Sequence, residues 1–207
     1  MKIALIGATG FTGAKILAEA LARGHAVTAI VRDAAKLPAH PLLNAVAADA
    51  ADAAQLARAA AGHDLAISAF NPAGDGDGSA TLAIIDGVKR AGVARLLVVG
   101  GAGSLAHPAG GRVVDQPDFP VEWKAAAERT ARFLDQLRDE KELDWVFLSP
   151  AAMLVPGART GRYRTGDDDL LVDAEGASRI SLEDYACAML DEAERPQRHR
   201  ARFTVAW

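Results

Sequence analysis

Short runs of apolar residues alternate along the chain with longer stretches in which apolar residues recur every three or four positions. Uninterrupted apolar runs are typical of strands that are buried on both faces of a sheet, and the spacing of the longer stretches is typical of amphipathic helices. Regular alternation of the two favours strand–helix–strand units around a mostly parallel sheet. We therefore expect a single doubly wound α/β domain over residues 1–207.

Six strands and four helices are predicted in the first three quarters of the chain. The strands are expected at Lys2–Ile6, Ala26–Arg32, Asn44–Ala48, Leu65–Phe70, Arg95–Gly100 and Trp145–Ser149. The helices are expected at Thr12–Arg23, Asp52–Ala61, Ser79–Ala91 and Val121–Glu140. Gly24 and Gly92 follow two of these helices, at the position where a left-handed residue commonly ends a helix.

The last third of the chain has a less regular pattern. Residues Gly157–Gly166 are rich in Arg, Gly and Thr without apolar periodicity, which indicates a loop, and a short strand is expected at Leu170–Val172. Ser181 opens a predicted helix that runs through Glu194, because a serine followed by an acidic residue three positions later can bond the free amides of a first turn. A final strand is expected at Arg202–Val205. No repeat or low-complexity linker divides the chain.

Composition and charge exclude several classes of protein. Hydrophobic residues make up 50% of the 207 positions and charged residues 24%, a balance that permits a buried core. The 23 basic and 27 acidic residues give a net charge of −4 with the basic residues scattered, so nucleic-acid binding is not expected. The single cysteine, Cys187, cannot form an intramolecular disulfide, and the first apolar run is too short for a signal peptide or membrane span. These features predict a cytoplasmic protein without membrane contact.

Metal binding is not expected either. The acidic stretches Asp167–Asp169 and Gly74–Gly78 resemble fragments of calcium loops but lack the ligand spacing that ends in a bidentate glutamate. The five histidines show no paired ligand spacing. Cys187 lies in the predicted last helix, where a small thiol that fills the core is the default interpretation.

A glycine-rich motif, Gly7-Ala-Thr9-Gly10-Phe11-Thr12-Gly13, directly follows the first predicted strand and opens the first helix. This is the context of a dinucleotide-binding fingerprint. The first glycine permits the tight turn off the strand, the second lets a pyrophosphate approach the backbone, and the third lets helix and strand pack closely. The amides of Phe11 and Thr12 would then face the phosphates at the positive end of the helix dipole.

The GxxGxxG spacing resembles that of the atypical short-chain dehydrogenase/reductase superfamily. More narrowly, the chain is similar to the NAD(P)H-flavin reductase group within it, akin to NmrA-like and biliverdin reductase B-like proteins. The stretches that carry the resemblance span nearly the whole chain: Lys2–Gly10, Leu96–Leu105, Leu148–Pro150, Pro156–Gly161 and Arg202–Trp207. The resemblance implies a Rossmann fold and an NAD(P)-dependent oxidoreductase.

Arg32 is the candidate that decides which nucleotide is bound. Sites selective for NAD place a carboxylate at the end of the second strand, whereas sites selective for NADP place an arginine there for the additional phosphate. Arg32 occupies this position, and its planar guanidinium suits a phosphate, so NADP(H) is favoured over NAD(H). Asp33 follows immediately and could instead serve a ribose hydroxyl, and Arg32 could also be a solvated residue at a strand end.

The resemblance also implies roles for residues that follow the later strands. Asp49 and Ala50 should border the adenine, although Asp49 could equally be the N-cap of the helix that follows. The remaining cofactor-binding residues that the resemblance implies are Ala69, Phe70 and Asn71 along the nicotinamide-side ribose, together with Gly100, Gly101 and Pro150.

The sequence departs from the superfamily at the catalytic acid. Other members use a Tyr-x-x-x-Lys pair, but here Tyr163 is followed four residues later by Asp167, and Tyr185 by Met189. Lys124, at the start of the long helix after the fifth strand, could reach the nicotinamide ribose, and Ser104 could offer a hydroxyl beside the substrate. Each could also be an ordinary surface or turn residue.

Because the chain lacks the tyrosine of a Tyr-x-x-x-Lys pair, hydride transfer to an acceptor that needs no positioned proton donor is favoured. A flavin or quinone meets this condition, because charge on the reduced ring is delocalised and the proton can come from water. We therefore expect an NAD(P)H-dependent reductase of such a small planar molecule. The alternative is a non-catalytic NADP(H)-binding redox sensor of the NmrA type. No oligomeric state is indicated by the sequence.

Three arginines in the predicted loop after Pro150 leave two interpretations open. Arg159, Arg162 and Arg164 could cover an anionic substrate or the phosphates of the cofactor, or they could simply lie in a solvated loop.

Overall fold

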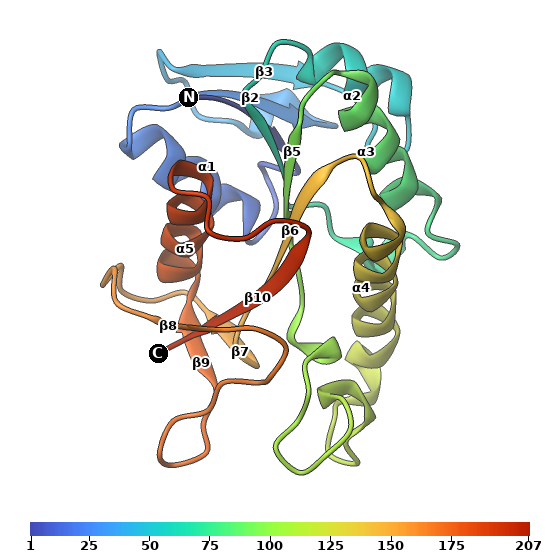
Figure 1. Cartoon of the computed structure of the whole chain (residues 1–207). Helices are drawn as coiled ribbons and strands as arrows, with labels where there is room; N and C mark the ends of the chain where they lie inside the picture. The colour runs from blue at the N-terminus through green and yellow to red at the C-terminus, as the bar shows by residue number, and fades with distance from the viewer.

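A central sheet of eight strands organises the computed structural model, which describes all residues from 1 to 207 (Figure 1). The strand order is β3-β2-β1-β4-β5-β6-β10-β8, and every pair is parallel except β10 with β8. In this order the strands are β3 (Leu43–Ala47), β2 (Ala26–Val31), β1 (Lys2–Ile6), β4 (Leu65–Ser68), β5 (Arg95–Val99), β6 (Asp144–Ser149), β10 (Ala201–Ala206) and β8 (Arg164–Gly166). The predicted doubly wound α/β fold is confirmed.

Helices cover the two faces of this sheet, as Figure 1 shows. On one face lie α1 (Gly13–Ala22) and α5 (Leu182–Glu194), and on the other lie α2 (Ala53–Ala60), α3 (Ser79–Arg90) and α4 (Val121–Asp139). Alternate residues of β1 enter the two cores: Ile3 and Leu5 pack on the side of α1 and α5, whereas Ala4 and Ile6 pack on the opposite side. Burial on both faces explains why the strands are continuous apolar runs.

The predicted helix ends are found where the local chemistry places them. Gly24 and Gly92 adopt left-handed φ values of +79° and +72° directly after α1 and α3. At the start of α5, the Ser181 hydroxyl accepts a hydrogen bond from the Asp184 N–H at 3.0 Å. The cap predicted for Ser181 is therefore confirmed. No helix has both the length and the apolar character needed to cross a membrane.

The structure corrects the prediction in the last third of the chain. Residues 170–172 form no strand; the Leu170 N–H bonds the Ala106 carbonyl oxygen at 2.9 Å as part of an isolated bridge between Asp169 and Ala106, which does not extend into a ladder. β8 lies within the predicted loop and pairs with β10 as an exposed edge strand. A separate parallel pair, β7 (Met153–Val155) with β9 (Arg179–Ser181), was not predicted. Strands of three residues are too short to show a periodic pattern.

Candidate cofactor-binding site

A cavity of about 630 Å³ opens at the carboxyl ends of β1, β2, β3 and β4. The strand order reverses between β1 and β4, which is the point where ligands of open α/β sheets bind. Loops that follow four different strands contribute its wall. The predicted cofactor residues that line it are Gly7, Thr9, Gly10, Arg32, Asp49, Ala50, Ala69, Phe70 and Asn71.

The three glycines of the motif have distinct surroundings. Gly7 has a φ of +78°, and a Cβ there would lie 2.7 Å from the Ala69 carbonyl oxygen. A Cβ on Gly13 would lie 2.1 Å from the Gly7 carbonyl oxygen, so these two positions require glycine for the fold itself. Gly10 lines the cavity, and the atom nearest to a Cβ at this position would be the Gly7 carbonyl oxygen, at 3.3 Å. Its missing side chain therefore leaves the backbone open to the cavity.

Free amide groups lie at the start of α1. The main-chain N–H groups of Phe11 and Thr12 donate to no other group of the chain, whereas the Thr12 carbonyl oxygen already accepts from Ile16 at 3.1 Å. No side chain caps this helix. Unpaired amides at the positive end of a helix dipole are a site for an anion such as a pyrophosphate. Together with the bare backbone at Gly10, they suit a dinucleotide.

Arg32 and Asp33 have different surroundings at the end of β2. Arg32 lines the cavity, is exposed, and forms no ion pair within the chain. The Asp33 carboxylate accepts a hydrogen bond from the Ala35 N–H at 3.1 Å and lies 3.8 Å from Lys36 Nζ, so it caps the 3₁₀ turn Ala34–Lys36. Of the two candidates for recognising the adenine-side ribose, Arg32 is the one without a competing partner.

Asp49 is not the N-cap of α2, which corrects one of its two predicted roles. The cap is Asp52, whose carboxylate accepts hydrogen bonds from the N–H groups of Ala54 and Gln55 at 2.9 and 3.0 Å. Asp49 lies three residues too early and binds the Ala51 N–H at 3.0 Å within its own loop while lining the cavity.

A second wall of the cavity was not predicted. It consists of the segment after β4, with Ala73, Gly74, Asp75, Gly76, Asp77 and Ser79. Side chains of α4 hold this segment: Arg132 Nη1 donates to the Gly76 carbonyl oxygen at 2.8 Å, and Gln136 Nε2 donates to that of Gly78 at 3.0 Å. The glycine-rich stretch after a strand was the available signal, but its contacts with α4 join residues far apart in the sequence.

Other predicted site residues lie outside the cavity but follow β1, β5 and β6 at the same edge of the sheet. Phe11 is 63% exposed, and Pro150 is buried directly after β6. The two glycines after β5 are explained by packing: a Cβ on Gly100 would lie 2.3 Å from the Phe147 ring, and one on Gly101 would lie 3.2 Å from Thr130 Cγ2.

The two candidate catalytic residues do not line the cavity. The Ser104 hydroxyl, in the 3₁₀ turn Ala102–Ser104, accepts a hydrogen bond from Arg202 Nη1 at 3.0 Å, and Arg202 in turn pairs with Asp168. Lys124 is exposed in the first turn of α4.

Both tyrosines are held away from the cavity. The Tyr185 hydroxyl donates to the Leu148 carbonyl oxygen at 2.6 Å, and complete burial raises the pKa of this phenol well above its usual value. The Tyr163 hydroxyl donates to Asp191, and partial burial followed by that carboxylate raises its pKa as well. Neither phenol is therefore placed to act as the acid of a Tyr-x-x-x-Lys pair.

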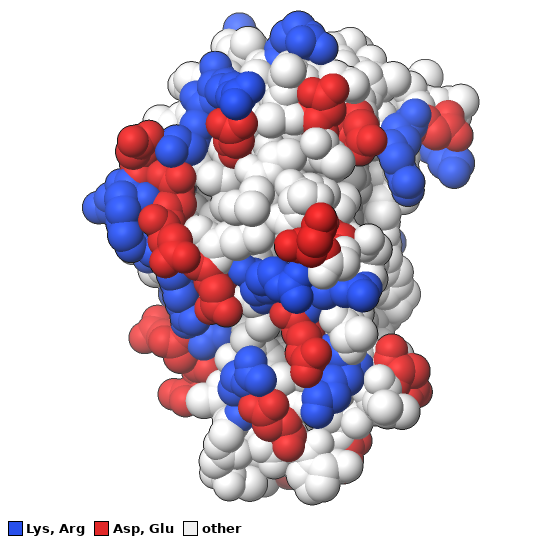
Figure 2. Space-filling model, turned by 90° about the vertical axis from the view of Figure 1, so that its right-hand side faces the viewer, with Lys and Arg blue, Asp and Glu red and all other residues white.

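Charged side chains elsewhere form no continuous basic surface on the face shown in Figure 2, where basic and acidic groups are interspersed. No group of three His, Cys, Asp or Glu side chains is arranged to hold a metal ion.

The doubly wound sheet, the glycine loop with free amides and the cavity at the reversal of strand order define a Rossmann-type dinucleotide-binding protein. The chain belongs to the NAD(P)H-binding family, whose model matches residues 7–193. This result confirms the resemblance to atypical short-chain dehydrogenases/reductases and identifies NAD(P)H as the class of cofactor.

Relatives of similar length cover essentially the whole chain. The Bacillus subtilis (strain 168) protein YwnB is 43% identical over 212 residues, which span 99% of this chain and 98% of that protein. A Bacteroides thetaiotaomicron protein provisionally designated an epimerase is 48% identical with a TM-score of 0.95, covering 100% of this chain and 96% of the other. A Streptococcus pneumoniae TIGR4 protein provisionally designated an NADH-flavin reductase is 34% identical with a TM-score of 0.83, covering 100% and 99%.

Proposed function

We propose that the protein is an NADPH-dependent reductase that transfers a hydride to a small planar acceptor such as a flavin or quinone. The observation that carries this proposal is an NAD(P)H-type cavity without a tyrosine placed as a proton donor. Such a site suits acceptors whose reduced form tolerates delayed protonation. The provisional designation of the Streptococcus pneumoniae relative as an NADH-flavin reductase agrees with this choice.

Different residues of the site hold different parts of the cofactor. The amides of Phe11 and Thr12 bind the pyrophosphate, and Gly10 keeps the approach open. The unpaired guanidinium of Arg32 binds the 2′-phosphate, which favours NADPH over NADH. Asp49 borders the adenine. The bound cofactor supplies the hydride, and the proton that completes reduction of the acceptor comes from water.

Exposed apolar side chains follow the carboxyl ends of three parallel strands of the sheet. Phe11 comes after β1, Trp123 after β5 and Met153 after β6, with exposures of 63%, 57% and 48%. Loops after parallel strands lie at one edge of the sheet, and we assign these side chains to packing against the planar ring of the acceptor. Lys124 and Ser104 lie on the segment after β5, and we assign them to orienting the nicotinamide ribose and the acceptor.

Steady-state oxidation of NADPH with a panel of flavins and quinones tests this function. We expect the absorbance at 340 nm to fall with at least one acceptor, with one NADPH consumed per two-electron acceptor reduced. If the protein binds NADPH tightly but turns over none of them, the enzyme proposal is refuted, and the non-catalytic redox sensor replaces it.

A further inference from the structure

The segment between β4 and α3, residues 71–78, contributes a wall of the cofactor cavity and has little regular structure of its own. It contains only the 3₁₀ turn Pro72–Gly74, and every second residue from Gly74 to Gly78 is a glycine. A Cβ on Gly74 or Gly76 would have no atom within 4 Å, so packing does not hold these residues. The position of the wall therefore depends on hydrogen bonds.

One set of hydrogen bonds joins the segment to α3. The buried Asp75 carboxylate accepts from the N–H groups of Ala80 and Thr81 at 3.1 and 3.0 Å, and from the Thr81 hydroxyl at 3.1 Å. A carboxylate that accepts the free amides of a first turn stabilises the start of a helix. The side chain of Asp75 is therefore occupied by α3 and anchors the middle of the segment.

A second set joins the same segment to α4, which lies beside it in Figure 1. Arg129 Nη1 donates to the Ala73 carbonyl oxygen, and Arg132 Nη1 donates to that of Gly76 at 2.8 Å. Neither carbonyl oxygen accepts a hydrogen bond from another group of the chain. The two arginines are three positions apart, so they project from the same face of the helix. They alone satisfy these two carbonyl groups.

Gly78 shows how closely α4 approaches the segment. Its φ is +82°, and a Cβ there would lie 2.7 Å from Gln136 Nε2 and 3.1 Å from Arg132 Cδ. Gln136 Nε2 also donates to the Gly78 carbonyl oxygen at 3.0 Å. The segment and α4 therefore form a packed contact as well as a set of hydrogen bonds.

The hydrogen bond from Arg132 also determines where the next main-chain amide points. In a trans peptide the C=O and N–H groups point in opposite directions, and the chain has no cis peptide. Because the Gly76 carbonyl oxygen faces α4, the N–H of Asp77 points away from that helix. The N–H groups of Gly76 and Asp77 donate to no other residue of the chain, and both residues line the cavity. The wall therefore carries two free main-chain donors.

The charges around these donors favour an uncharged acceptor. The Asp77 carboxylate accepts from the Ser79 N–H at 3.0 Å and lies on the same residue as one of the free donors. A phosphate at this N–H would be repelled by the adjacent carboxylate. The phosphates of the cofactor are assigned to the glycine loop and Arg32, whereas the ring nitrogens of adenine are uncharged acceptors.

We propose that the Gly76–Asp77 peptide binds the edge of the adenine ring, and that Arg132, supported by Arg129, is the positioning residue that holds this peptide in place. Neither arginine lines the cavity, so each acts only through the carbonyl oxygen that it binds. This inference rests on the cofactor binding of the proposed function, since it names the groups that recognise the base. It does not depend on which acceptor is reduced.

Adenosine 2′,5′-bisphosphate and uridine 2′,5′-bisphosphate are a matched pair of probes, because they share the sugar and both phosphates and differ in the base. Calorimetry should show that Arg132→Ala raises the dissociation constant of the adenosine compound about fivefold, in line with the loss of one neutral hydrogen bond. The dissociation constant of the uridine compound should stay unchanged. If both constants rise by the same factor, the wall holds the sugar or the phosphates, and the assignment to adenine is refuted.

Two further variants separate the hydrogen bond from packing and from charge. Arg132→Met keeps an unbranched side chain against Gly78 without the donor, and it should give the same loss as Arg132→Ala. Arg138→Ala is the control, because it removes an exposed arginine of the same helix that bonds Asp135 at 3.1 Å and does not contact the wall. Parent-like affinity in Arg132→Met, or an equal loss in Arg138→Ala, would overturn the positioning role. Arg132 is exposed, so thermal melting should show all three variants folded.

Neither probe contains nicotinamide, so this test is independent of turnover. In the reductase assay, Arg132→Ala should raise the KM for NADPH about fivefold and leave kcat unchanged, because the base is far from the reacting carbon. If the binding of the adenosine compound depends on Arg132 but no acceptor is reduced, the reductase proposal fails and the positioning role stands. If NADPH is oxidised and neither binding nor KM responds to Arg132→Ala, the positioning role is refuted and the reductase stands.

Discussion

Substitutions at Gly10 and Gly13 should separate the part of the glycine loop that binds the cofactor from the part that maintains the fold. A Cβ on Gly13 would lie 2.1 Å from the Gly7 carbonyl oxygen, so the backbone of the loop must move by about 1 Å to accept even alanine. A Cβ on Gly10 would lie 3.3 Å from the same oxygen, which requires a shift of only a few tenths of an ångström. A side chain at Gly13 would therefore displace the backbone of the loop, whereas a side chain at Gly10 would project into the space of the cofactor.

The expected magnitudes follow from these distances. Gly13→Ala should cost about 3 kcal/mol, at the upper end for overpacking, which lowers the melting temperature by roughly 6–12 °C in a protein of this size. Gly10→Ala should change stability by less than about 1 kcal/mol, because mild crowding is offset by the reduced entropy of the unfolded chain. Gly10→Val places a branched side chain in the cavity. Loss of two charge-assisted hydrogen bonds, each about 1.5–3 kcal/mol, weakens NADPH binding at least 100-fold.

Thermal melting by circular dichroism and NADPH titration by calorimetry measure the two effects. Gly92→Ala is the matched control: its φ is +72° with no atom within 4 Å of a Cβ, so it should lose about 1 kcal/mol of stability and keep its affinity for NADPH. If Gly10→Val stays folded and binds NADPH as tightly as the parent protein, the pyrophosphate does not lie on this loop and the cofactor site must be reassigned.

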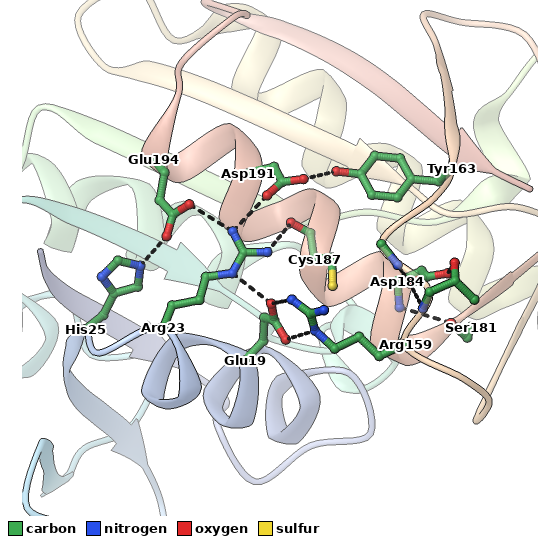
Figure 3. Close-up of polar contacts among 12 residues, drawn as sticks. Glu19, Arg23, His25, Arg159, Tyr163, Ser181, Asp184, Cys187, Asp191 and Glu194 are labelled. Carbon is green, nitrogen blue, oxygen red and sulfur yellow. Dashed lines mark hydrogen bonds and ion pairs between the residues drawn. The ribbon is translucent and has the colours of Figure 1, made fainter.

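Four further results are expected. Arg32→Ala should remove a preference for NADPH over NADH of about 10–100-fold in calorimetric affinity, whereas Asp33→Ala should keep it; equal affinities in the parent protein would contradict this role. Hydrogen bonds from Arg159 and then Arg23 lower the pKa of Glu19 to about 2 (Figure 3). The ionised Glu19 carboxylate therefore stabilises the fold above its ordinary pKa, and this contribution is lost as the pH falls from about 4.3 towards 2. The free energy of unfolding of Glu19→Gln should accordingly fall less steeply with pH in that window than that of the parent protein. Burial, with Glu19 adding to it, raises the pKa of the Cys187 thiol to about 11, and the residue is 1% exposed, so iodoacetamide at pH 8 should label it only after unfolding. Tyr185→Phe should lower stability by about 1 kcal/mol in a denaturant titration and leave NADPH oxidation unchanged, and a large loss of turnover in a folded variant would mark this phenol as catalytic.

The regular alternation of parallel strands and helices could be predicted from the sequence, because residues close together in the chain determine it. Most parallel strands of the central sheet are apolar runs, and the glycine motif stands at the turn from β1 to α1, so strand, turn and helix are determined by neighbouring residues. Nine of the predicted cofactor residues line one cavity for the same reason: they directly follow parallel strands, whose ends share one edge of the sheet. The cap at Ser181 likewise depends on a residue only three positions away.

Features that depend on long-range contacts were not predictable. The second cavity wall around Asp75 and Gly76 depends on Arg132, 56 residues from the carbonyl oxygen it binds. The assignment of β8 depends on pairing with β10, because its own sequence is polar and three residues long. The hydrogen bond from Arg202 to the Ser104 hydroxyl joins residues 98 positions apart.

The sequence by itself determined the order of the seven parallel strands of the central sheet and of the five helices, the doubly wound class and the class of cofactor that the glycine loop serves, because residues adjacent in the chain encode these properties. Only the tertiary structure decided which of two neighbouring charges, Arg32 or Asp33, is left without a partner, and which arginine of the loop after β7 is free. A charged side chain becomes available to a ligand only when no other group satisfies it. The partners that satisfy Arg159 and Arg164 come from α1 and the end of β10, which the folded chain alone brings to this loop.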